Sequence, residues 1–465
     1  MSNKRSWYEY IPHPVVMLFV IIVIAAVLTH ILPAGIYERI EIDGRQRVVP
    51  GSYHNVASSP VGFFEMFKAF PAGFKTASAI IFVVLSSGIM FGVLQKTGAI
   101  ENMVGTAIHK LGLEQRYTII FVLTYLFGLL GVIIGYENNI AMVPIAAVVA
   151  LALGGDLVLA AGLSVGAITV GFGLSPINPY TVGMGHTIAE MPLFSGAGLR
   201  TALCFMALTL MAWYNVRYFK KIDENPEASL GQALDTEGLA LSKPLETYRI
   251  SQNNAMVGAI FLAGIVVMLI GVFQYHWYFT EISAIFLMIA IAVGLASRMS
   301  GSELSDTILK SVGVVAPGAF MVGYATSIKE VLELGQINDT ISHQLSLVLT
   351  DLPTTFSALG MSMCQSLINL FIPSGSGQAL ATLPIMIPLG EVLGLTRQTT
   401  ILAFQIGDGI TNLFNPALGG LIAMLSLCRV PFDRWLRFIL PLTGMLLILA
   451  WLFLVAAVLM GYGSV

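Results

Sequence analysis

The 465-residue chain is 56% hydrophobic and 11% charged, and its mean hydropathy is +0.83. Because a soluble domain carries about a quarter charged residues, this composition excludes an ordinary soluble protein and predicts a helical protein that crosses a lipid bilayer several times. The long apolar runs exclude a membrane β-barrel, whose strands alternate in short segments. The net charge of −3 indicates neither a nucleic acid nor another highly charged partner.

Thirteen apolar segments predict an all-α polytopic membrane protein. In chain order they span 13–34, 77–97, 116–136, 140–156, 157–186, 192–218, 254–273, 280–297, 304–328, 353–373, 377–394, 397–419 and 433–459. The first is too long for a signal-peptide core and should remain as a helix, because about 20 apolar residues cross the hydrocarbon core. Two polar stretches, 36–75 and 219–253, interrupt the series, and the second is predicted to be a cytoplasmic linker.

The two halves of the chain repeat. "TGAIENMV" at 97–104 aligns with "LGQINDTI" at 334–341 at an offset of 237 residues. The same offset superposes the Asn-Pro pairs at 178–179 and 415–416, and it superposes Glu137 on Ser374. We therefore predict an internal duplication in which residues 1–218 form the first repeat and residues 254–465 form the second.

Segments 116–156 and 353–394 are each predicted to form a re-entrant hairpin, which enters and leaves the membrane on one side. About nine other crossings remain, and five of them lie between the hairpins. This odd number places the second hairpin on the opposite face, so the repeats are predicted to be inverted. Inverted repeats with interrupted helices are typical of secondary transporters. If both arms of a hairpin instead span the membrane, its tip is an ordinary exterior turn.

The distribution of lysine and arginine predicts the orientation in a bacterial-type inner membrane. With the N-terminus inside, as Lys4 and Arg5 indicate, the cytoplasmic segments hold most of the basic residues. The outer face then keeps the five basic residues of 36–75 together with Lys329, Arg397 and Arg200. This bias agrees with the positive-inside rule.

The second hairpin tip lies in "NLFIPSGSGQALATLPIMIP" at 369–388, a glycine-rich polar turn in an apolar stretch. Non-helical backbone at membrane depth is tolerated only where it is buried in protein or lines a water-filled cavity. Glycine allows a close approach to a ligand, and amides at the start of a half-helix favour anions. The predicted substrate-binding residues here are Ser374, Gly375, Ser376, Gly377 and Gln378.

The first half has "GYENNIAM" at the equivalent place, where Glu137, Asn138 and Asn139 interrupt an apolar run. An acid inside a bilayer costs at least a few kcal/mol and indicates a functional site. Glu137 could hold a substrate ammonium group, a coupling cation or a proton. If the hairpin is instead a full span, Glu137 is a solvated loop residue without a role.

Each hairpin precedes a segment predicted to be a broken helix, 157–186 with "SPINP" or 397–419 with "GDGITNLFNP". Proline removes a hydrogen bond from the helix, which frees carbonyl groups to coordinate a cation. The alternative is a proline kink in which asparagines cap the freed backbone. Further predicted substrate-binding residues are Asn178, Asp408, Thr411 and Asn412. The predicted ion-binding residues are Asn139, Ser175, Asn178, Ser376, Asp408, Asn412 and Asn415.

The motifs "SGSGQA", "LPI" and "FQIGDGITN" in the second half, with "KTGAI" and "INP" in the first, resemble those of the YfcC-type carriers. These are grouped with the anaerobic C4-dicarboxylate carriers of the DcuC type in the ion transporter superfamily. The resemblance covers nearly the whole chain. It implies a transport domain of hairpins and interrupted helices, a scaffold domain that forms a homodimer, and elevator-like movement. It also implies transport of dicarboxylates or exchange of arginine and ornithine.

Two departures from the family pattern affect the expected substrate. Asn138 follows Glu137 where such carriers often have two adjacent acids, and an Asn-Pro pair at 415–416 replaces a frequent Thr-Pro pair. Fewer acids weaken the case for a doubly cationic substrate. Against a dicarboxylate, the four candidate segments contain no lysine or arginine.

We therefore predict a secondary active transporter for a small anionic or zwitterionic solute, either an exchanger or coupled to Na⁺ or H⁺, without another cofactor. An amino acid of the arginine or ornithine type is slightly preferred, and a C4-dicarboxylate is the alternative. A channel or an intramembrane enzyme is a more distant alternative. The chain has no filter repeat, its seven histidines lack His-Glu-x-x-His spacing, and its three cysteines are predicted to be packing residues.

Overall fold

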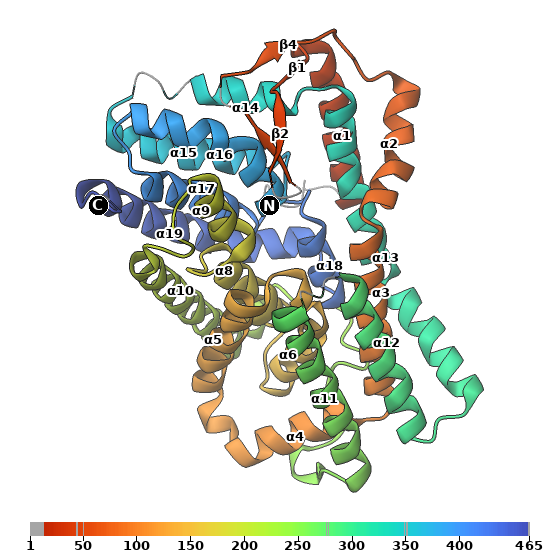
Figure 1. Cartoon of the computed structure of the whole chain (residues 1–465). Coiled ribbons are helices and arrows are strands. Elements are labelled where there is room, and N and C mark those ends of the chain that lie inside the picture. The colour runs from red at the N-terminus through yellow and green to blue at the C-terminus, as the bar shows by residue number, and fades with distance from the viewer. Residues whose placement is uncertain are drawn as a thin grey trace, which may run out of the picture.

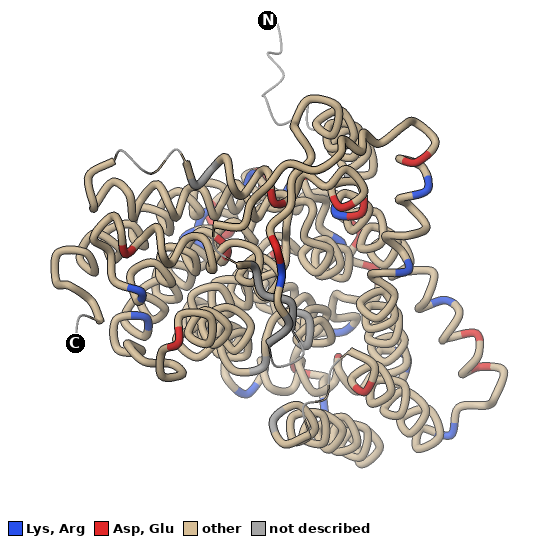
Figure 2. Tube along the Cα trace, turned by 45° about the horizontal axis from the view of Figure 1, so that its top comes forward, with Lys and Arg blue, Asp and Glu red and all other residues tan. Residues whose placement is uncertain are grey.

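The computed structural model describes residues 14–42, 45–49, 51–275, 277, 279–347, 349 and 352–463. Lys4 and Arg5, which indicated the orientation, lie outside the described residues, as do the side chains of Glu137 and Asn138. Helices dominate the described part (Figure 1), and charged residues are sparse along it (Figure 2). The helices form two bundles, each containing elements from both halves of the chain.

The first bundle combines the first helices of each half. From the first half it takes α1 (Pro14–Ile31), α2 (Phe63–Thr76) and α3 (Ser78–Lys96), and from the second half α11 (Gln252–Tyr275), α12 (Phe279–Ala296) and α13 (Gly301–Leu334). α13 packs against α1, α2 and α3 along its length (Figure 1). Gly88 permits this closeness, because a Cβ atom there would lie 2.5 Å from Val315 on α13.

The second bundle begins with a helix–turn–helix in each half. In the first half, α5 (Arg116–Ile134), a 3₁₀ segment (Glu137–Met142) and α6 (Val143–Ala152) form it, and in the second half α15 (Thr354–Asn369) and α16 (Gly375–Val392). The short helices α4 (Ala99–Leu111) and α14 (Asn338–Leu347) lead into these units. The sequence did not predict α4 or α14, because both lie between the apolar segments.

A broken helix follows each helix–turn–helix. In the first half it comprises α7 (Leu157–Ala161), α8 (Ala167–Gly173) and α9 (Met184–Ile188), with π-helical turns at Gly162–Gly166 and Pro179–Gly183. In the second half it comprises α17 (Arg397–Thr411) and α18 (Gly419–Leu427). The long helices α10 (Ala197–Glu224) and α19 (Phe432–Leu459) close the two halves. The breaks predicted near 175–179 and 408–416 are therefore present at 174–178 and 412–418.

The helices of the two halves follow the same order from α3 to α10 and from α13 to α19. Seven helices among the described residues are long and apolar enough to cross a membrane, namely α3, α5, α10, α11, α12, α13 and α19. One of these seven helices, α5, is an arm of the first predicted hairpin. Its length would also permit this arm to cross the whole membrane. The inverted relation of the repeats, the nine crossings and the re-entrant depth of the hairpins stay predictions.

The prediction of an all-α protein is wrong for residues 35–55. β1 (Gly35–Ile36) pairs antiparallel with β4 (His54–Asn55), and β2 (Arg39–Ile42) pairs antiparallel with β3 (Arg45–Val48). The polar stretch 36–75 also contains α2, which continues into α3 after a break at Ala77. Two-stranded ribbons of this length have no core of their own, so packing against the helices must hold them.

The ribbon β1–β4 is held on α14 by a cluster of polar and aromatic side chains. Asp339 is buried and accepts hydrogen bonds from the Tyr37 amide at 2.9 Å and from Arg39 Nη2 at 2.7 Å. The Tyr37 hydroxyl is hydrogen-bonded to His343 Nδ1 at 2.9 Å, and the Tyr53 ring stacks on the His343 ring at 4.0 Å. Burial lowers the pKa of His343 below its ordinary value of 6.5.

The segment between the halves is also held against the helices. α10 extends to Glu224, so the predicted linker boundary at 219 falls inside this helix. Asp156 Oδ2 accepts hydrogen bonds from the Tyr218 and Ser229 hydroxyls, both at 2.6 Å. Glu101 of α4 accepts from the Tyr248 hydroxyl at 2.5 Å. The linker therefore lies on the end of the molecule that carries α4, and the ribbons lie on the opposite end (Figure 1).

Because the pKa of His343 is lowered, we expect the docking of the β1–β4 ribbon on α14 to depend on pH. The docked ribbon favours neutral His343, so this contribution to stability is present at neutral pH and is lost as the pH falls below 6.5 and through the folded-state value. We expect amide hydrogen exchange in β1 and β4, corrected for intrinsic rates, to increase between about pH 7.5 and about pH 5. His343→Gln cannot titrate and should remove this increase, and an increase that persists in the variant contradicts the assignment.

Candidate functional site

A cavity of about 180 Å³ lies where the two helix–turn–helix tips meet the two helix breaks. Both bundles contribute to its wall, because α3 and α12 of the first bundle face the tips of the second. The lining residues are Ile80, Gly135, Tyr136, Phe172, Tyr180, Phe279, Pro373, Ser374, Gly375, Ser376, Asn412 and Leu418. We call this space the central cavity. None of the described residues that line it is a lysine or an arginine.

The second tip presents the start of a helix to the central cavity. The turn occupies 370–374, and Ser374 is the N-cap of α16, with its hydroxyl accepting a hydrogen bond from the Gly377 amide at 3.3 Å. The predicted glycine-rich turn is therefore the first turn of a helix, which corrects the sequence interpretation. The amides of Gly375 and Ser376 have no acceptor within their own helix. Two main-chain donors and the Ser376 hydroxyl thus lie at the cavity wall.

Gly375 brings this helix start against the break of the first half. A Cβ atom at position 375 would lie 2.6 Å from Thr181 Cγ2 and 3.4 Å from Asp408 Oδ2. The backbone of Gly375 is helical, so glycine is required here for closeness and not for an unusual dihedral angle. Thr181 and Asp408, from opposite halves of the chain, consequently lie on either side of the tip.

Three buried oxygen atoms around this tip have no hydrogen-bond donor among the described residues. They are Asp408 Oδ2, Asn412 Oδ1 and Thr181 Oγ1. The other carboxylate oxygen of Asp408 accepts from Asn369 Nδ2 at 2.8 Å. A buried acceptor without a partner costs about 1–3 kcal/mol, and a charged one costs more. This arrangement therefore suits a cation, a substrate ammonium group or a proton.

A chain of amides orients Asp408. Asn415 Nδ2 donates to the carbonyl oxygen of Asn369 at 2.7 Å and to its Oδ1 at 2.9 Å. Asn369 Nδ2 also lies within hydrogen-bond distance of Gln378 Oε1, at 3.2 Å. Gln378 in turn donates to Gln365 Oε1 at 2.6 Å. Asn415 and Gln378 therefore position Asn369 and do not face the central cavity themselves.

Three predicted site residues of the first half have side chains that bond to the backbone. Asn178 accepts from the amides of Tyr180 and Thr181, at 2.8 and 3.3 Å, and donates to the Phe172 carbonyl at 2.9 Å. Ser175 donates to the Val132 carbonyl at 3.3 Å, and Asn139 donates to the Gly135 carbonyl at 2.5 Å. The bonds of Asn178 are those of a proline kink in which an asparagine caps the freed backbone, which was the alternative interpretation of this break.

Among the described side chains, the structure therefore sorts the predicted residues into three groups. Ser374, Gly375, Ser376 and Asn412 line the central cavity. Asp408 lies directly behind the tip, and Gly377 and Thr411 belong to the ends of α16 and α17. The side chains that hold the breaks and tips are those of Asn139, Ser175, Asn178, Gln378 and Asn415.

Sequence reasoning missed several residues at this site. Tyr136, Phe172 and Tyr180 line the central cavity, and Thr181 and Asn369 border Gly375 and Asp408. Phe172 and Tyr180 lie in an apolar segment, where they are indistinguishable from core residues. Asn369 and Tyr136 offered a signal, because each stands beside a polar motif that the sequence analysis singled out.

The sequence position of Arg200 predicted that it lies on the outer face. The structure instead buries it. Its side chain is fully buried and donates to Gln398 Oε1 at 2.8 Å, to Gln405 Oε1 at 3.2 Å and to the Tyr462 hydroxyl at 3.1 Å. Gln405 then donates to the Ser175 carbonyl at 2.7 Å. Gln405 thus connects the buried guanidinium of Arg200 to the first break by two hydrogen bonds. No acidic side chain among the described residues pairs with it.

The described residues contain no group of three histidine, cysteine or acidic side chains that could hold a metal ion. Cys204, Cys364 and Cys428 are free and buried, which confirms the prediction that they are packing residues. Among the described side chains and backbone, the candidate site therefore consists of main-chain amides, hydroxyls, amide oxygens and one carboxylate. These groups can bind a small charged solute or a hard cation without a metal cofactor.

Comparison with known proteins decides the family. The profile of DcuC, the C4-dicarboxylate anaerobic carrier, matches residues 11–459. This chain belongs to the DcuC family. Membership supports a membrane carrier, and it confirms the resemblance seen in the sequence motifs.

Individual relatives agree with this membership. YfcC of Escherichia coli (strain K12), named provisionally as a basic amino acid antiporter, is 28% identical over 499 residues, which cover 98% of each chain. An uncharacterized protein of Haemophilus influenzae is 26% identical over 504 residues, again 98% of each chain. The solved structure of Neisseria gonorrhoeae MtrF, from a class of antimetabolite efflux pumps, covers 96% of this chain and 95% of its own at 16% identity, with a TM-score of 0.44. A TM-score of this size does not establish a common fold.

The contact at Gly375 can be tested by adding one methyl group. In Gly375→Ala the new Cβ atom would overlap Thr181, and such over-packing costs about 1–3 kcal/mol. We expect a lower thermal unfolding temperature of the purified protein, measured by intrinsic fluorescence. Gly444→Ala on α19 is the control, because a Cβ atom there meets nothing within 4 Å. Equal unfolding temperatures for the two variants would contradict the proposed closeness of tip and break.

Proposed function

We propose that this DcuC-family protein is a secondary active transporter for a small solute that carries a carboxylate, with an amino acid of the arginine or ornithine type preferred. The observation that supports this most is the central cavity, where both tips and both breaks converge on a space of about 180 Å³. Because water occupies about 30 Å³ per molecule, the cavity holds on the order of six waters. This is the scale of a metabolite.

The first turn of α16 is the proposed carboxylate site. Its amides at 375 and 376 lack acceptors within the helix, and the N-terminus of an 18-residue helix carries a partial positive charge. The Ser376 hydroxyl adds a third donor. Such a site binds a carboxylate without lysine or arginine, which explains how an anionic group could be held in a cavity that neither residue lines.

The unpartnered oxygens of Asp408, Asn412 and Thr181 form the proposed cation site beside it. They would accept from the ammonium group of an amino acid, or they would coordinate Na⁺ or bind H⁺ as the coupling ion. Glu137 and Asn138 of the first tip remain proposed contributors. The two bundles support an elevator-like mechanism, with the second bundle as the moving body, and the family resemblance supports a homodimer formed through the first bundle.

The choice between substrate classes rests on charge. One carboxylate site beside one cation site fits an amino acid, and the provisional name of YfcC also favours a basic amino acid. The family description favours the alternative, a C4-dicarboxylate transporter or exchanger. A dicarboxylate would need a second group of donors near the central cavity.

Counterflow in proteoliposomes tests the function. We expect saturable uptake of labelled L-arginine or L-ornithine against the same unlabelled solute inside, and weaker uptake of succinate. Ser376→Leu and Asn412→Leu place an apolar group in the central cavity and should abolish uptake. Asn253→Leu, at an exposed position of α11, is the control and should retain it.

Three results would contradict the proposal. Uptake that does not saturate indicates a channel. Uptake of succinate alone, at rates well above those of the amino acids, selects the dicarboxylate alternative. Equal uptake by wild type, Ser376→Leu and Asn412→Leu removes the central cavity from the transport path.

Asp408 is expected to link transport to the coupling ion. Asp408→Asn keeps the size of the side chain and an acceptor for Asn369, but it removes the charge. We expect the dependence of uptake on a Na⁺ gradient or on a pH gradient to disappear, whichever the wild type shows. Asp433→Asn at the start of α19 is the control, because it removes the same charge from a residue outside the candidate site. A gradient dependence that survives in Asp408→Asn places the coupling site elsewhere.

A further inference from the structure

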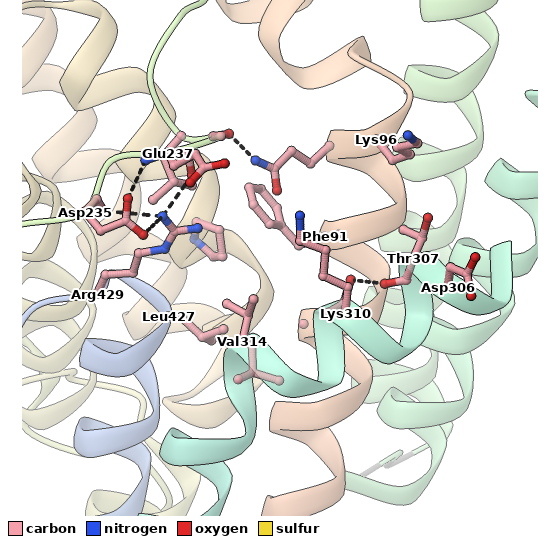
Figure 3. A pocket seen from close by; sticks show the side chains of 18 of the residues that line it. Phe91, Lys96, Asp235, Glu237, Asp306, Thr307, Lys310, Val314, Leu427 and Arg429 are labelled. Atoms are coloured by element: carbon pink, nitrogen blue, oxygen red, sulfur yellow. Dashed lines mark hydrogen bonds and ion pairs between the residues drawn. The ribbon is translucent and has the colours of Figure 1, made fainter. Parts of the chain in front are cut away.

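A second cavity, of about 750 Å³, lies at the linker end of the boundary between the two bundles (Figure 3). α3 and the first half of α13 form one wall, and Pro144 of α6 with Leu427 and Arg429 at the end of α18 form the other. Linker residues Asp235 and 237–239 complete the lining. We call this space the linker-side cavity. None of its lining residues lines the central cavity.

The linker is attached to both walls of this cavity. Arg429 Nη1 donates to Asp235 Oδ2 at 3.1 Å and to the Glu237 carbonyl at 2.8 Å. The side-chain amide of Gln95 on α3 donates to the Gly238 carbonyl. Arg429 belongs to the second bundle and Gln95 to the first, so the linker bridges the bundles at this point. These contacts fix the backbone on either side of the Glu237 carboxylate.

Seven charged side chains line the linker-side cavity, and three of them have no ion-pair partner among the described residues. Arg429 pairs with Asp235, and Lys96 lies 3.7 Å from Glu303. Among the described residues, no ion-pair partner lies within 4.0 Å of Glu237, Asp306 or Lys310. Glu237 belongs to the linker, and Asp306 and Lys310 lie one helical turn apart on α13, on the other side of the cavity (Figure 3). Two unpaired carboxylates and one unpaired ammonium group therefore face one space.

We propose that the linker-side cavity is a binding subsite for a basic amino acid on its way to or from the central cavity. Lys310 attracts the carboxylate of the solute, and Glu237 and Asp306 attract its two cationic groups. This inference rests on the proposed transport function and deepens it by adding a second binding place for the preferred substrate, a solute with one negative and two positive groups. A dicarboxylate presents the opposite pattern and meets two carboxylates there.

The size of the cavity determines how this subsite acts. A space of 750 Å³ holds on the order of 25 waters by the same measure, so a bound amino acid remains largely hydrated. Binding is then weak and electrostatic, and it raises the local concentration of solutes with matching charge. Because such attraction is screened over about 10 Å at 0.1 M salt, it must weaken as the ionic strength increases.

A fluorescent reporter in the linker-side cavity tests the proposal directly. Ser302 lines the cavity and is exposed, so Ser302→Cys accepts an environment-sensitive maleimide dye. The three native cysteines are buried and leave this as the reactive thiol. We expect L-arginine to change the fluorescence with a saturable dependence and succinate to leave it unchanged. An increase from about 50 mM to about 300 mM choline chloride should weaken the response to L-arginine.

Variants with a matched change in net charge identify the groups. Glu237→Gln with Asp306→Asn should raise the apparent Kd for L-arginine about ten-fold, since it removes both attractive charges. Glu227→Gln with Glu246→Gln is the control, because it also removes two negative charges, from linker residues that do not line the cavity. Lys310→Met should weaken the response to L-arginine but not to agmatine, which has no carboxylate.

The outcomes separate this inference from the transport function. An equal response to L-arginine and succinate, or an unchanged Kd in Glu237→Gln with Asp306→Asn, overturns the subsite. If L-arginine counterflow is saturable and the reporter gives no response, only the subsite is wrong. If the reporter responds but proteoliposomes show no arginine counterflow, the transport function is wrong and the binding subsite stands.

Discussion

The structure depends on satisfying the main-chain groups that two helix breaks and two helix–turn–helix tips expose inside an apolar protein. Unpaired backbone groups away from water cost free energy comparable to a lost hydrogen bond, so polar side chains must stay close to each break. Asn178 serves one break, and Asn415 connects the other to Asn369. After these bonds are counted, a few oxygen atoms near Gly375 are left without donors. The candidate site is what remains once the fold has used its own polar groups.

Close backbone contact brings the remaining groups of both halves together. A Cβ atom on Gly173 of α8 would lie 2.7 Å from the Cα atom of Gly409 on α17, so these helices touch immediately before their breaks. The polar segments that follow them consequently lie near each other, although they are more than 230 residues apart in the chain. Duplication thus supplies two modest polar segments, and packing converts them into one site.

The sequence predicted the order of apolar segments, both tips and both breaks, because long apolar runs and proline or glycine within them have direct local consequences. It could not predict the ribbons, since their stability comes from contacts such as that between Tyr37 and Asp339, 302 residues away. Nor could it separate cavity-lining aromatic residues from core residues. Asn139 and Asn178 were predicted to bind substrate or ion, whereas their side chains bond to the backbone. A polar residue beside a break looks the same in the sequence whether it binds a solute or the backbone.

Arg200 has a consequence for energetics. Its guanidinium is surrounded by neutral acceptors in the second bundle. The second bundle therefore carries a fixed positive charge in surroundings of low polarisability. If the second bundle travels relative to the first, this charge crosses part of the membrane's electric field. A full crossing by one elementary charge is worth about 2.3 kcal/mol per 100 mV. Membrane voltage would then bias the resting position of the carrier, and occupancy of Asp408 by a cation or proton would set the size of that bias.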